Sequence, residues 1–176
     1  MTDLPPSHLL YDRSHIDEAM DDMVETLNVR CGKGEWVIVC VMNGGLIFTS
    51  EIMLRLGFPV RLEFVHVSRY RDTTAGGELE WRVVPETDLR DKQVLLLDDI
   101  FDEGATLAAI ADYCQRLGAS DVVTAVLVEK LHDRKGTDFR PDLVGVTCPD
   151  AYVFGFGMDY HGLWRNLPEI RQLTGR

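Results

Sequence analysis

The sequence contains no long hydrophobic run, and no stretch approaches the roughly 18 uninterrupted apolar residues that a membrane helix needs. Residues 1–6 lack the basic-then-apolar order that is typical of a secretory signal peptide. Apolar residues still make up 45% of the 176 positions, which is enough for one globular domain with a core of its own. We therefore expect a single cytoplasmic domain over residues 1–176 with no membrane partner.

Cysteine and basic residues are also scarce. The four cysteines form no C-x-x-C pair, which argues against a zinc site or a disulfide framework. Lysine and arginine total 18 against 29 acidic residues, a formal net charge of −11, and nucleic-acid binding needs basic patches. We expect no nucleic acid as a partner. A small anionic substrate remains compatible with this charge, because backbone amides, a magnesium ion and a few basic side chains can create a local positive potential.

Short apolar strands alternate with helical patterns along the chain. Strands are expected at residues 36–41, 60–67, 80–84, 94–97, 122–128, 143–146 and 152–156. Helices are expected at residues 14–30, 46–56 and 106–117, with Ser14 capping the first and a helical turn near Leu163. This alternation predicts an α/β fold with a doubly wound, mainly parallel sheet flanked by helices. Residues 69–79 have no apolar period and are expected to form a long loop.

Residues 94–106 are the most informative segment of the chain. Four apolar residues indicate a strand buried on both faces, and the carboxylates Asp98, Asp99 and Asp102 follow it. Gly104 and the start of a helix come next. Ligands of open α/β sheets bind beyond the carboxyl ends of strands, and the amides at a helix start suit a phosphate. The segment therefore offers amides for a phosphate, and carboxylates for hydroxyls or a divalent cation.

Two other interpretations fit the three carboxylates less well. The spacing Asp98-Asp99-x-x-Asp102 also matches the magnesium-diphosphate motif of isoprenoid synthases. That motif lies inside long helices of all-α chains, whereas here it follows a buried strand and precedes a glycine. A plain charged turn is the second alternative, but three carboxylates at one strand end repel one another unless a cation or hydroxyl donors offset them. A functional site explains that cost more easily.

Two blocks of this sequence resemble the type I phosphoribosyltransferases, in detail the hypoxanthine-guanine type. Residues 94–106 resemble their motif for phosphoribosyl pyrophosphate (PRPP), and residues 149–160 with Arg165 resemble their purine-recognition end. The likeness extends over residues 35–170. It implies the type I phosphoribosyltransferase fold, with a small purine-binding hood formed by the terminal segments, and a homodimer or homotetramer.

The same resemblance implies an activity. A magnesium-dependent enzyme of this kind transfers phosphoribosyl from PRPP to hypoxanthine or guanine, giving the nucleoside monophosphate and pyrophosphate in purine salvage. Asp98 and Asp99 are implied to contact the ribose hydroxyls and to help hold Mg²⁺. Asp159 is implied to contact the metal or the base edge.

The resemblance also implies which residues bind the 5′-phosphate of PRPP. The 5′-phosphate is implied to lie on the backbone amides of the loop and helix start, with one hydroxyl, at Asp102, Glu103, Gly104, Ala105 and Thr106. Glu103 stands where the family commonly has threonine, so we expect its carboxylate to point away from the phosphate.

Pyrophosphate is implied to bind the loop Met42-Asn43-Gly44-Gly45, where the peptide before Asn43 is often strained or cis in the family. Gly44 lets the chain approach the ligand closely. Asn43 replaces a lysine that is frequent there, which leaves the strength of pyrophosphate binding open. Arg165 is implied to hold pyrophosphate. Arg69 with Tyr70 begins the long loop, and we hypothesise that Arg69 supplies part of the missing positive charge.

The purine end completes the implied site. Asp102 is the expected general base, accepting the N7 proton while N9 attacks C1′ of the ribose. Lys130 is expected to donate to the 6-oxo group, which favours hypoxanthine or guanine over adenine. Tyr152 is expected to stack on the purine and Val153 to meet its edge through backbone groups. Simpler interpretations stay open: a solvated side chain for Lys130, a core aromatic for Tyr152, ordinary surface charges for Asp159 and Arg165, and a plain turn for residues 42–45. Residues 132–135 are interpreted as a solvated turn without a role in the site.

Two rival functions stay open at this level. One is a regulatory protein that keeps the PRPP-binding fold but senses nucleotide and binds RNA or DNA. The acidic composition, Asp102 and Lys130 count against it. The other is the same transfer reaction with adenine, a pyrimidine or xanthine as the acceptor.

Overall fold

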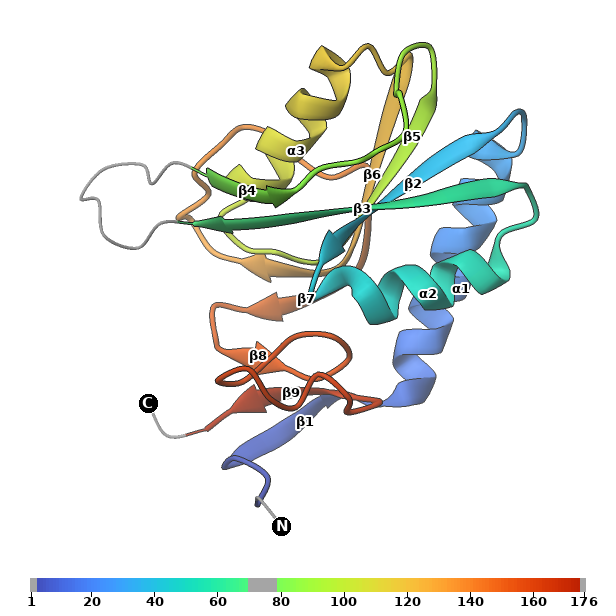
Figure 1. Ribbon diagram of the computed structural model, residues 1–176. Helices are drawn as coiled ribbons and strands as arrows, with labels where there is room; N and C mark the ends of the chain where they lie inside the picture. Colours follow the sequence, from blue (N-terminus) through green and yellow to red (C-terminus); the bar gives the residue numbers. More distant parts are fainter. Residues whose placement is uncertain (1–2, 70–78, 175–176) are drawn as a thin grey trace.

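The computed structural model describes residues 3–69 and 79–174. Its main sheet has six strands in the order β4-β3-β2-β5-β6-β7 (Figure 1). The strands are β2 (Trp36–Met42), β3 (Val60–Arg69), β4 (Leu79–Val83), β5 (Gln93–Phe101), β6 (Asp121–Leu131) and β7 (Leu143–Pro149). All neighbours pair in parallel except β3 and β4, which are antiparallel. The expected mainly parallel sheet is confirmed.

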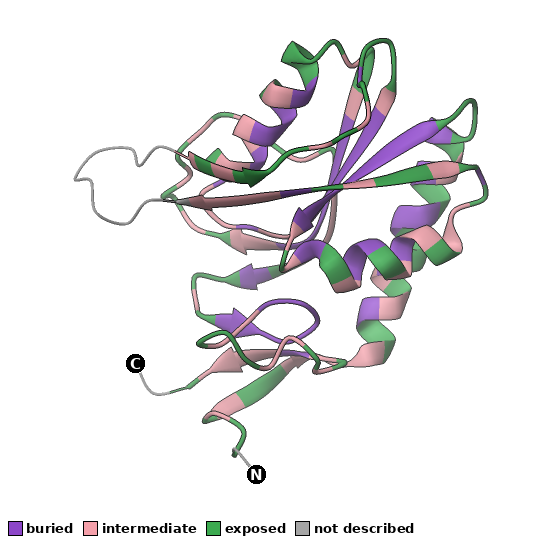
Figure 2. Ribbon diagram, viewed as in Figure 1, coloured by how far each residue is buried: buried purple, intermediate pink, exposed green. Residues whose placement is uncertain are grey.

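Helices cover both faces of this sheet, as a doubly wound fold requires. They are α1 (Arg13–Cys31), α2 (Gly45–Arg55) and α3 (Ala105–Arg116). Alternate residues of the central strands point to opposite faces. In β5, Leu95 and Leu97 pack with α1 and α2, whereas Val94 and Leu96 pack with α3. The central strands are therefore buried on both faces, as Figure 2 shows in purple.

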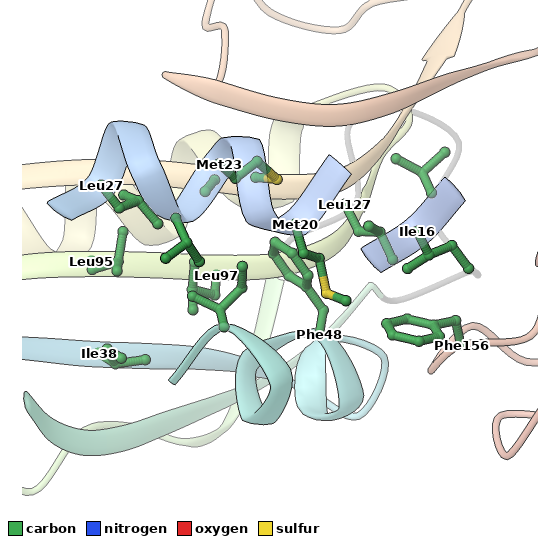
Figure 3. Close-up of a cluster of buried hydrophobic side chains, with 14 of the residues drawn as sticks. Ile16, Met20, Met23, Leu27, Ile38, Phe48, Leu95, Leu97, Leu127 and Phe156 are labelled. Carbon is green, nitrogen blue, oxygen red and sulfur yellow. The ribbon is translucent and has the colours of Figure 1, made fainter. Parts of the chain in front are cut away.

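The core between α1, α2 and the sheet also includes the end of the chain. Met20 of α1, Phe48 of α2 and Leu97 of β5 are fully buried there (Figure 3). Phe156, from the segment after β8, packs into the same cluster and is 1% exposed. This packing attaches the C-terminal segment to the main sheet.

A small second sheet joins the two ends of the described chain. It has the antiparallel order β1-β9-β8, with β1 (Ser7–Tyr11), β8 (Val153–Phe154) and β9 (Ile170–Leu173) (Figure 1). The terminal segments thus form a small unit, although its purine-binding role as a hood stays a prediction. Strands β1 and β9 were not expected, because short segments with little apolar alternation become strands only through their pairing.

Several local predictions need correction. Asp12, not Ser14, caps α1: its Oδ1 accepts the His15 backbone N–H at 3.0 Å. The expected helical turn near Leu163 is wrong, because Tyr160 and Leu163 form an antiparallel bridge instead. Tyr70 and most of the expected long loop lie outside the described residues. In the part of the chain that the structure describes, no helix is both long enough and apolar enough to cross a bilayer.

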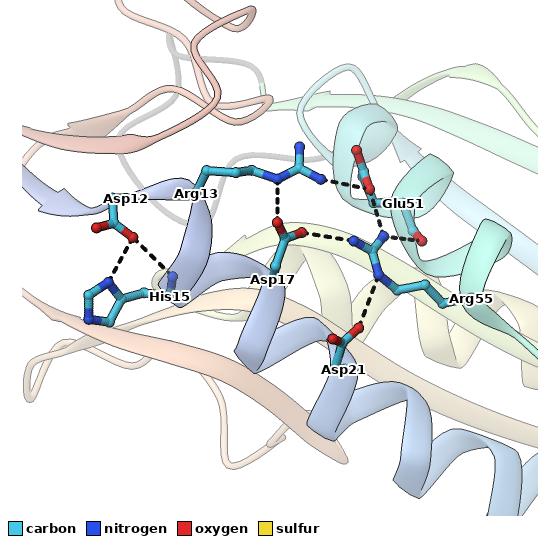
Figure 4. Close-up of polar contacts among 7 residues, drawn as sticks. All are labelled: Asp12, Arg13, His15, Asp17, Asp21, Glu51 and Arg55. Atoms are coloured by element: carbon cyan, nitrogen blue, oxygen red, sulfur yellow. Dashed lines mark hydrogen bonds and ion pairs between the residues drawn. The ribbon is translucent and has the colours of Figure 1, made fainter.

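An ion-pair network joins α1 to α2 beside the core (Figure 4). Arg55 of α2 contacts Asp17 at 2.8 Å, Asp21 at 3.2 Å and Glu51 at 2.6 Å. Arg13 contacts Asp17 and Glu51 at 2.8 and 3.0 Å. The hydrogen bond from Arg13 lowers the pKa of Asp17, and that from Arg55 lowers the pKa of Glu51.

Removing Arg55 from this network, which leaves the two Arg13 pairs in place, should lower stability in a pH-dependent way. For Arg55→Met we expect the free energy of unfolding at neutral pH to fall by about 1 kcal/mol, measured by urea denaturation. Carboxylates with lowered folded pKa values stabilise the fold above their unfolded pKa and lose that contribution as the pH falls through the folded pKa. The difference from wild type should therefore shrink below about pH 4. Arg116→Met, which removes one exposed pair with Asp112, is the control and should change little.

Candidate active site

The first feature of the site is the end of β5. This strand continues to Phe101, four residues beyond the expected end, because Asp98, Ile100 and Phe101 still pair with β6. Asp98 is 8% exposed, and its Oδ1 accepts the Asp99 backbone N–H at 2.9 Å. Burial, and then the charge of Asp99, raises the pKa of Asp98 well above its usual value. Burial also raises that of Asp99. A divalent cation or hydroxyl donors would stabilise such a pair of carboxylates.

A cavity of about 420 Å³ lies beside these carboxylates. Its walls come from the ends of β2 and β5, the loop after β5 and the start of α3: Val41, Met42, Gly44, Asp98, Asp99, Ile100, Phe101, Asp102, Glu103, Gly104, Thr106 and Leu107. Most of the residues expected to bind ribose and 5′-phosphate are therefore assembled around one cavity. It lies at the carboxyl ends of parallel strands, where open α/β sheets bind ligands.

The loop after β2 closes one side of this cavity. Its Met42–Asn43 peptide bond is cis, as the resemblance implied. A Cβ on Gly44 would lie 1.8 Å from Asp99 Oδ2, so any side chain there would collide with the carboxylate. A Cβ on Gly157, which has φ +100°, would lie 2.1 Å from the Gly44 carbonyl oxygen. The C-terminal segment therefore touches the same loop that is expected to hold pyrophosphate.

The loop between β5 and α3 turns sharply at Gly104. This residue has φ +85°, a conformation that glycine adopts without strain, and it precedes the first residue of α3, Ala105. A Cβ on Gly104 would also lie 2.5 Å from the ring of Phe101. Together these constraints place the N-terminal turn of α3, with Thr106, at the cavity. Such a turn is a suitable site for an anion.

Asp102 carries two close contacts from the end of β6. Lys130 Nζ donates to its Oδ2 at 2.8 Å, and His132 Nε2 lies 2.7 Å from its Oδ1. The side chains of Lys130 and His132 are 14% and 4% exposed, whereas that of Asp102 is 41% exposed. Partial burial raises the pKa of Asp102, but the hydrogen bonds from Lys130 and His132 outweigh it and leave the pKa below its usual value. Asp102 is therefore an ionised carboxylate near neutral pH.

The interpretation of residues 132–135 as a solvated turn without a role in the site is wrong for His132 and Lys135, whereas Asp133 and Arg134 are exposed as expected. The His132 side chain is covered and lies against Asp102, and Lys135 Nζ donates to the carbonyl oxygens of Lys130 and Asp102 at 2.8 and 2.9 Å. The Lys135 ammonium also lies 4.4 Å from the centroid of the Phe101 ring. The turn thus holds the loop that carries Asp102. The sequence contained no periodic signal for these contacts, which depend on how the chain reverses after β6.

Glu103 lies beside the same turn. Its Oε1 is 3.8 Å from Arg134, which also contacts Asp150 at 2.6 Å. The attraction between this arginine and the Glu103 carboxylate favours an orientation in which the carboxylate points away from a bound phosphate. Its orientation with a phosphate bound stays a prediction.

The purine-recognition block forms a separate set of contacts. The Tyr152 hydroxyl donates to the Asp159 carbonyl oxygen at 2.9 Å. Arg165 contacts the Asp159 carboxylate at 2.7 Å and donates to the Gly157 carbonyl oxygen at 2.7 Å. Because Arg165 and the Gly162 backbone N–H occupy the carboxylate of Asp159, it is not free for a metal in this conformation. Within residues 3–69 and 79–174, no group of three His, Cys, Asp or Glu side chains is arranged to hold a metal ion.

Lys130 and Tyr152 line a second cavity of about 590 Å³, together with Asp150, Ala151, Gln172, Leu173 and Thr174. Tyr152 is 38% exposed, and its ring packs edge-on against Tyr160 with the centroids 5.6 Å apart. Val153 is buried in β8 and pairs with Gln172 of β9. Lys130 also contacts Asp102 in the first cavity, so it connects the two.

The chain is similar in sequence and structure to known proteins. Residues 10–161 match the family described as "Phosphoribosyl transferase domain". The chain belongs to this family. The match covers the candidate cavity and most of the purine-recognition block, and the family has the fold class that the sequence predicted.

Curated relatives indicate which type of phosphoribosyltransferase the chain is similar to. The chain is 34% identical over 135 residues to the hypoxanthine-guanine phosphoribosyltransferase of Aquifex aeolicus, covering 76% of this chain and 75% of that protein. It is 26% identical over 162 residues to the hypoxanthine-guanine-xanthine phosphoribosyltransferase of Tritrichomonas foetus, covering 92% and 88%. A crystal structure of a hypoxanthine phosphoribosyltransferase from Staphylococcus aureus superposes with a TM-score of 0.89 at 27% identity, covering 95% of this chain and 91% of that one. The chain is therefore a pentosyltransferase, as the resemblance implied.

Proposed function

We propose that this protein transfers phosphoribosyl from PRPP to hypoxanthine, guanine or both, with Mg²⁺, giving the nucleoside monophosphate and pyrophosphate in purine salvage. The contact between Lys130 Nζ and Asp102 Oδ2, at 2.8 Å, is the observation that supports this most directly. The 6-oxo group and N7 are neighbours on one edge of the purine. A donor for the oxygen and an acceptor for the N7 proton must therefore lie side by side, and Lys130 and Asp102 do.

The same pair supports a mechanism. In the structure, Lys130 and His132 contact the two oxygens of Asp102. A 6-oxopurine draws the Lys130 ammonium to its carbonyl, and Asp102 Oδ2 is then free to accept the N7 proton. N9 gains electron density as this proton leaves and attacks C1′ of the ribose, while the C1′–O bond breaks and its electron pair leaves with pyrophosphate. The carboxylate thus becomes a better base when the correct substrate binds.

PRPP is proposed to lie in the 420 Å³ cavity. The ribose hydroxyls would donate to Asp98 and Asp99, and the 5′-phosphate would lie on the backbone amides of residues 102–106 with the Thr106 hydroxyl. Asp98 and Asp99 would hold the ion, because they fit the preference of Mg²⁺ for oxygen ligands and a bound cation would offset the cost of their buried charge. The bound ion would supply charge stabilisation for the leaving pyrophosphate.

Pyrophosphate is proposed to contact the backbone at Asn43 and Gly44 and the guanidinium of Arg165. Asp159, paired with Arg165 at 2.7 Å, would hold that guanidinium in place. Arg69 is the last residue of β3, and its proposed contribution of positive charge, like that of Tyr70 to the loop, stays a prediction.

The base is proposed to lie against Tyr152 and the backbone of Val153 in the cavity that Lys130 also lines. A stacked aromatic and a backbone edge would orient the purine with N7 toward Asp102. The homodimer or homotetramer and the cytoplasmic location that the sequence suggested stay predictions.

Parallel assays with PRPP, Mg²⁺ and single bases test the proposal. We expect turnover with hypoxanthine or guanine, and a kcat/KM for adenine at least about 10²-fold lower, because the Lys130 ammonium finds no acceptor in a 6-amino group. Xanthine belongs in the same panel, since a relative's name includes it. Equal or better use of adenine would contradict the role of Lys130. Salt-dependent binding of RNA or DNA without any transfer would instead favour a regulatory protein.

A further inference from the structure

His132 is a polar residue at the site whose side chain is almost fully covered and has no assigned role. Its side chain is 4% exposed, yet both ring nitrogens are engaged. Nε2 lies 2.7 Å from Asp102 Oδ1, and Nδ1 accepts the Arg134 backbone N–H at 3.0 Å. Buried polar groups are normally satisfied in this way, but here one partner is the expected base itself.

The Arg134 contact determines which tautomer His132 adopts. A backbone N–H can only donate, so Nδ1 must offer its lone pair and cannot carry a hydrogen. A neutral ring then has its hydrogen on Nε2, and Nε2 donates to Asp102 Oδ1. If Nδ1 carried a hydrogen, the Nδ1–H and the Arg134 backbone N–H would point at each other, and neither would have an acceptor. With Nδ1 accepting the Arg134 N–H, the geometry directs Nε2 toward one oxygen of the carboxylate.

We propose that His132 is a positioning residue for Asp102. Its Nε2–H holds Oδ1 of the carboxylate in place. Only Oδ2 then loses its hydrogen bond from Lys130 and accepts the N7 proton of the purine. This inference rests on the proposed function of Asp102 and adds the element that keeps the base oriented. When Lys130 turns to the purine, the carboxylate loses one of its two donors. Without His132 it would then be free to rotate away from N7.

Two substitutions separate this role from packing. The His132→Asn side chain is short: its oxygen can still accept the Arg134 N–H, as Nδ1 does, but its amide does not reach Asp102. The His132→Gln side chain is longer and can place an N–H near the Nε2 position. The other charged or titratable groups that face Asp102 or His132 are unchanged in both variants: Lys130, Arg134, Lys135, Cys148 and Asp150.

The experiment measures kcat, KM for PRPP and the pH profile of kcat for the full chain with the best base. For His132→Asn we expect kcat to fall about tenfold with KM for PRPP unchanged, because a misoriented base loses near-attack geometry. The acidic limb of the profile should move to higher pH, because a donor that favours the charged carboxylate is gone. His132→Gln should restore both. An acidic limb that does not move in His132→Asn, or that moves equally in both variants, would overturn the proposal.

A second measurement tests the His132 tautomer directly and does not depend on catalytic activity. In ¹⁵N-detected histidine spectra near neutral pH, the signals that His132→Asn removes should show Nε2 protonated and Nδ1 unprotonated. The reverse pattern, or a doubly protonated ring, would also overturn the proposal. If wild type transfers phosphoribosyl to no base, the proposed function fails. If wild type is active and the His132 results are negative, only this inference fails.

Discussion

Asp102→Asn is expected to lower kcat for purine transfer by about 10²- to 10⁴-fold, the usual contribution of a positioned general base. Asparagine keeps the size of the side chain but cannot take the N7 proton. Its amide also presents hydrogens where Asp102 now accepts from both Lys130 and His132, so one of those contacts is lost. Steady-state kinetics with hypoxanthine and guanine measure the effect.

PRPP should still bind to this variant with an affinity close to that of wild type, because backbone amides rather than the Asp102 side chain are expected to hold the 5′-phosphate. Isothermal titration with PRPP and Mg²⁺ tests this separately from turnover. Asp112→Asn, an exposed change on α3 that removes a single pair with Arg116, should leave kcat unchanged. Wild-type turnover in Asp102→Asn would mean that another group accepts the proton.

Lys130→Met has the second largest expected effect. We expect kcat/KM for hypoxanthine and guanine to fall about 10²- to 10³-fold, because a charged donor to the 6-oxo group is lost and the purine oxygen is left unpaired. The change also removes a hydrogen bond that lowers the pKa of Asp102, so the acidic limb of the kcat profile should move to higher pH.

Competition assays measure whether Lys130 also sets the choice of base. In Lys130→Met, the ratio of kcat/KM for hypoxanthine to kcat/KM for adenine should decrease toward one, because the ammonium that distinguishes a 6-oxo from a 6-amino group is gone. Lys92→Met is the matched control, because Lys92 is exposed before β5 and far from the described contacts of Asp102. A preserved ratio would show that selectivity against adenine comes from another part of the site.

Much of the fold and the candidate site could be predicted from local patterns. Apolar runs such as 94–97 are strands buried on both faces because helices pack on each side. The carboxylates Asp98, Asp99 and Asp102 lie around one cavity because they follow a parallel strand at its carboxyl end. These features depend on residues close together in the sequence, so periodicity and motif spacing could indicate them.

Other features depend on chain reversals that no local pattern records. Strand β5 extends past Leu97 only because β6 continues beside it, and β1 is a strand only because β9 pairs with it. His132 and Lys135 reach the Asp102 loop because the chain turns back after β6.

The sequence alone thus determined the sheet, its helices and the acidic cluster, since each follows from apolar periodicity and neighbouring residues. Only the tertiary structure decided how Asp102 is held. Its partners, Lys130 and His132, lie 28 and 30 positions away in the sequence. Contacts over that separation are set by strand pairing and by the turn at residues 132–135. A hydrogen bond to a charged group forms only at close range, so these two partners of Asp102 could be identified only from the folded structure.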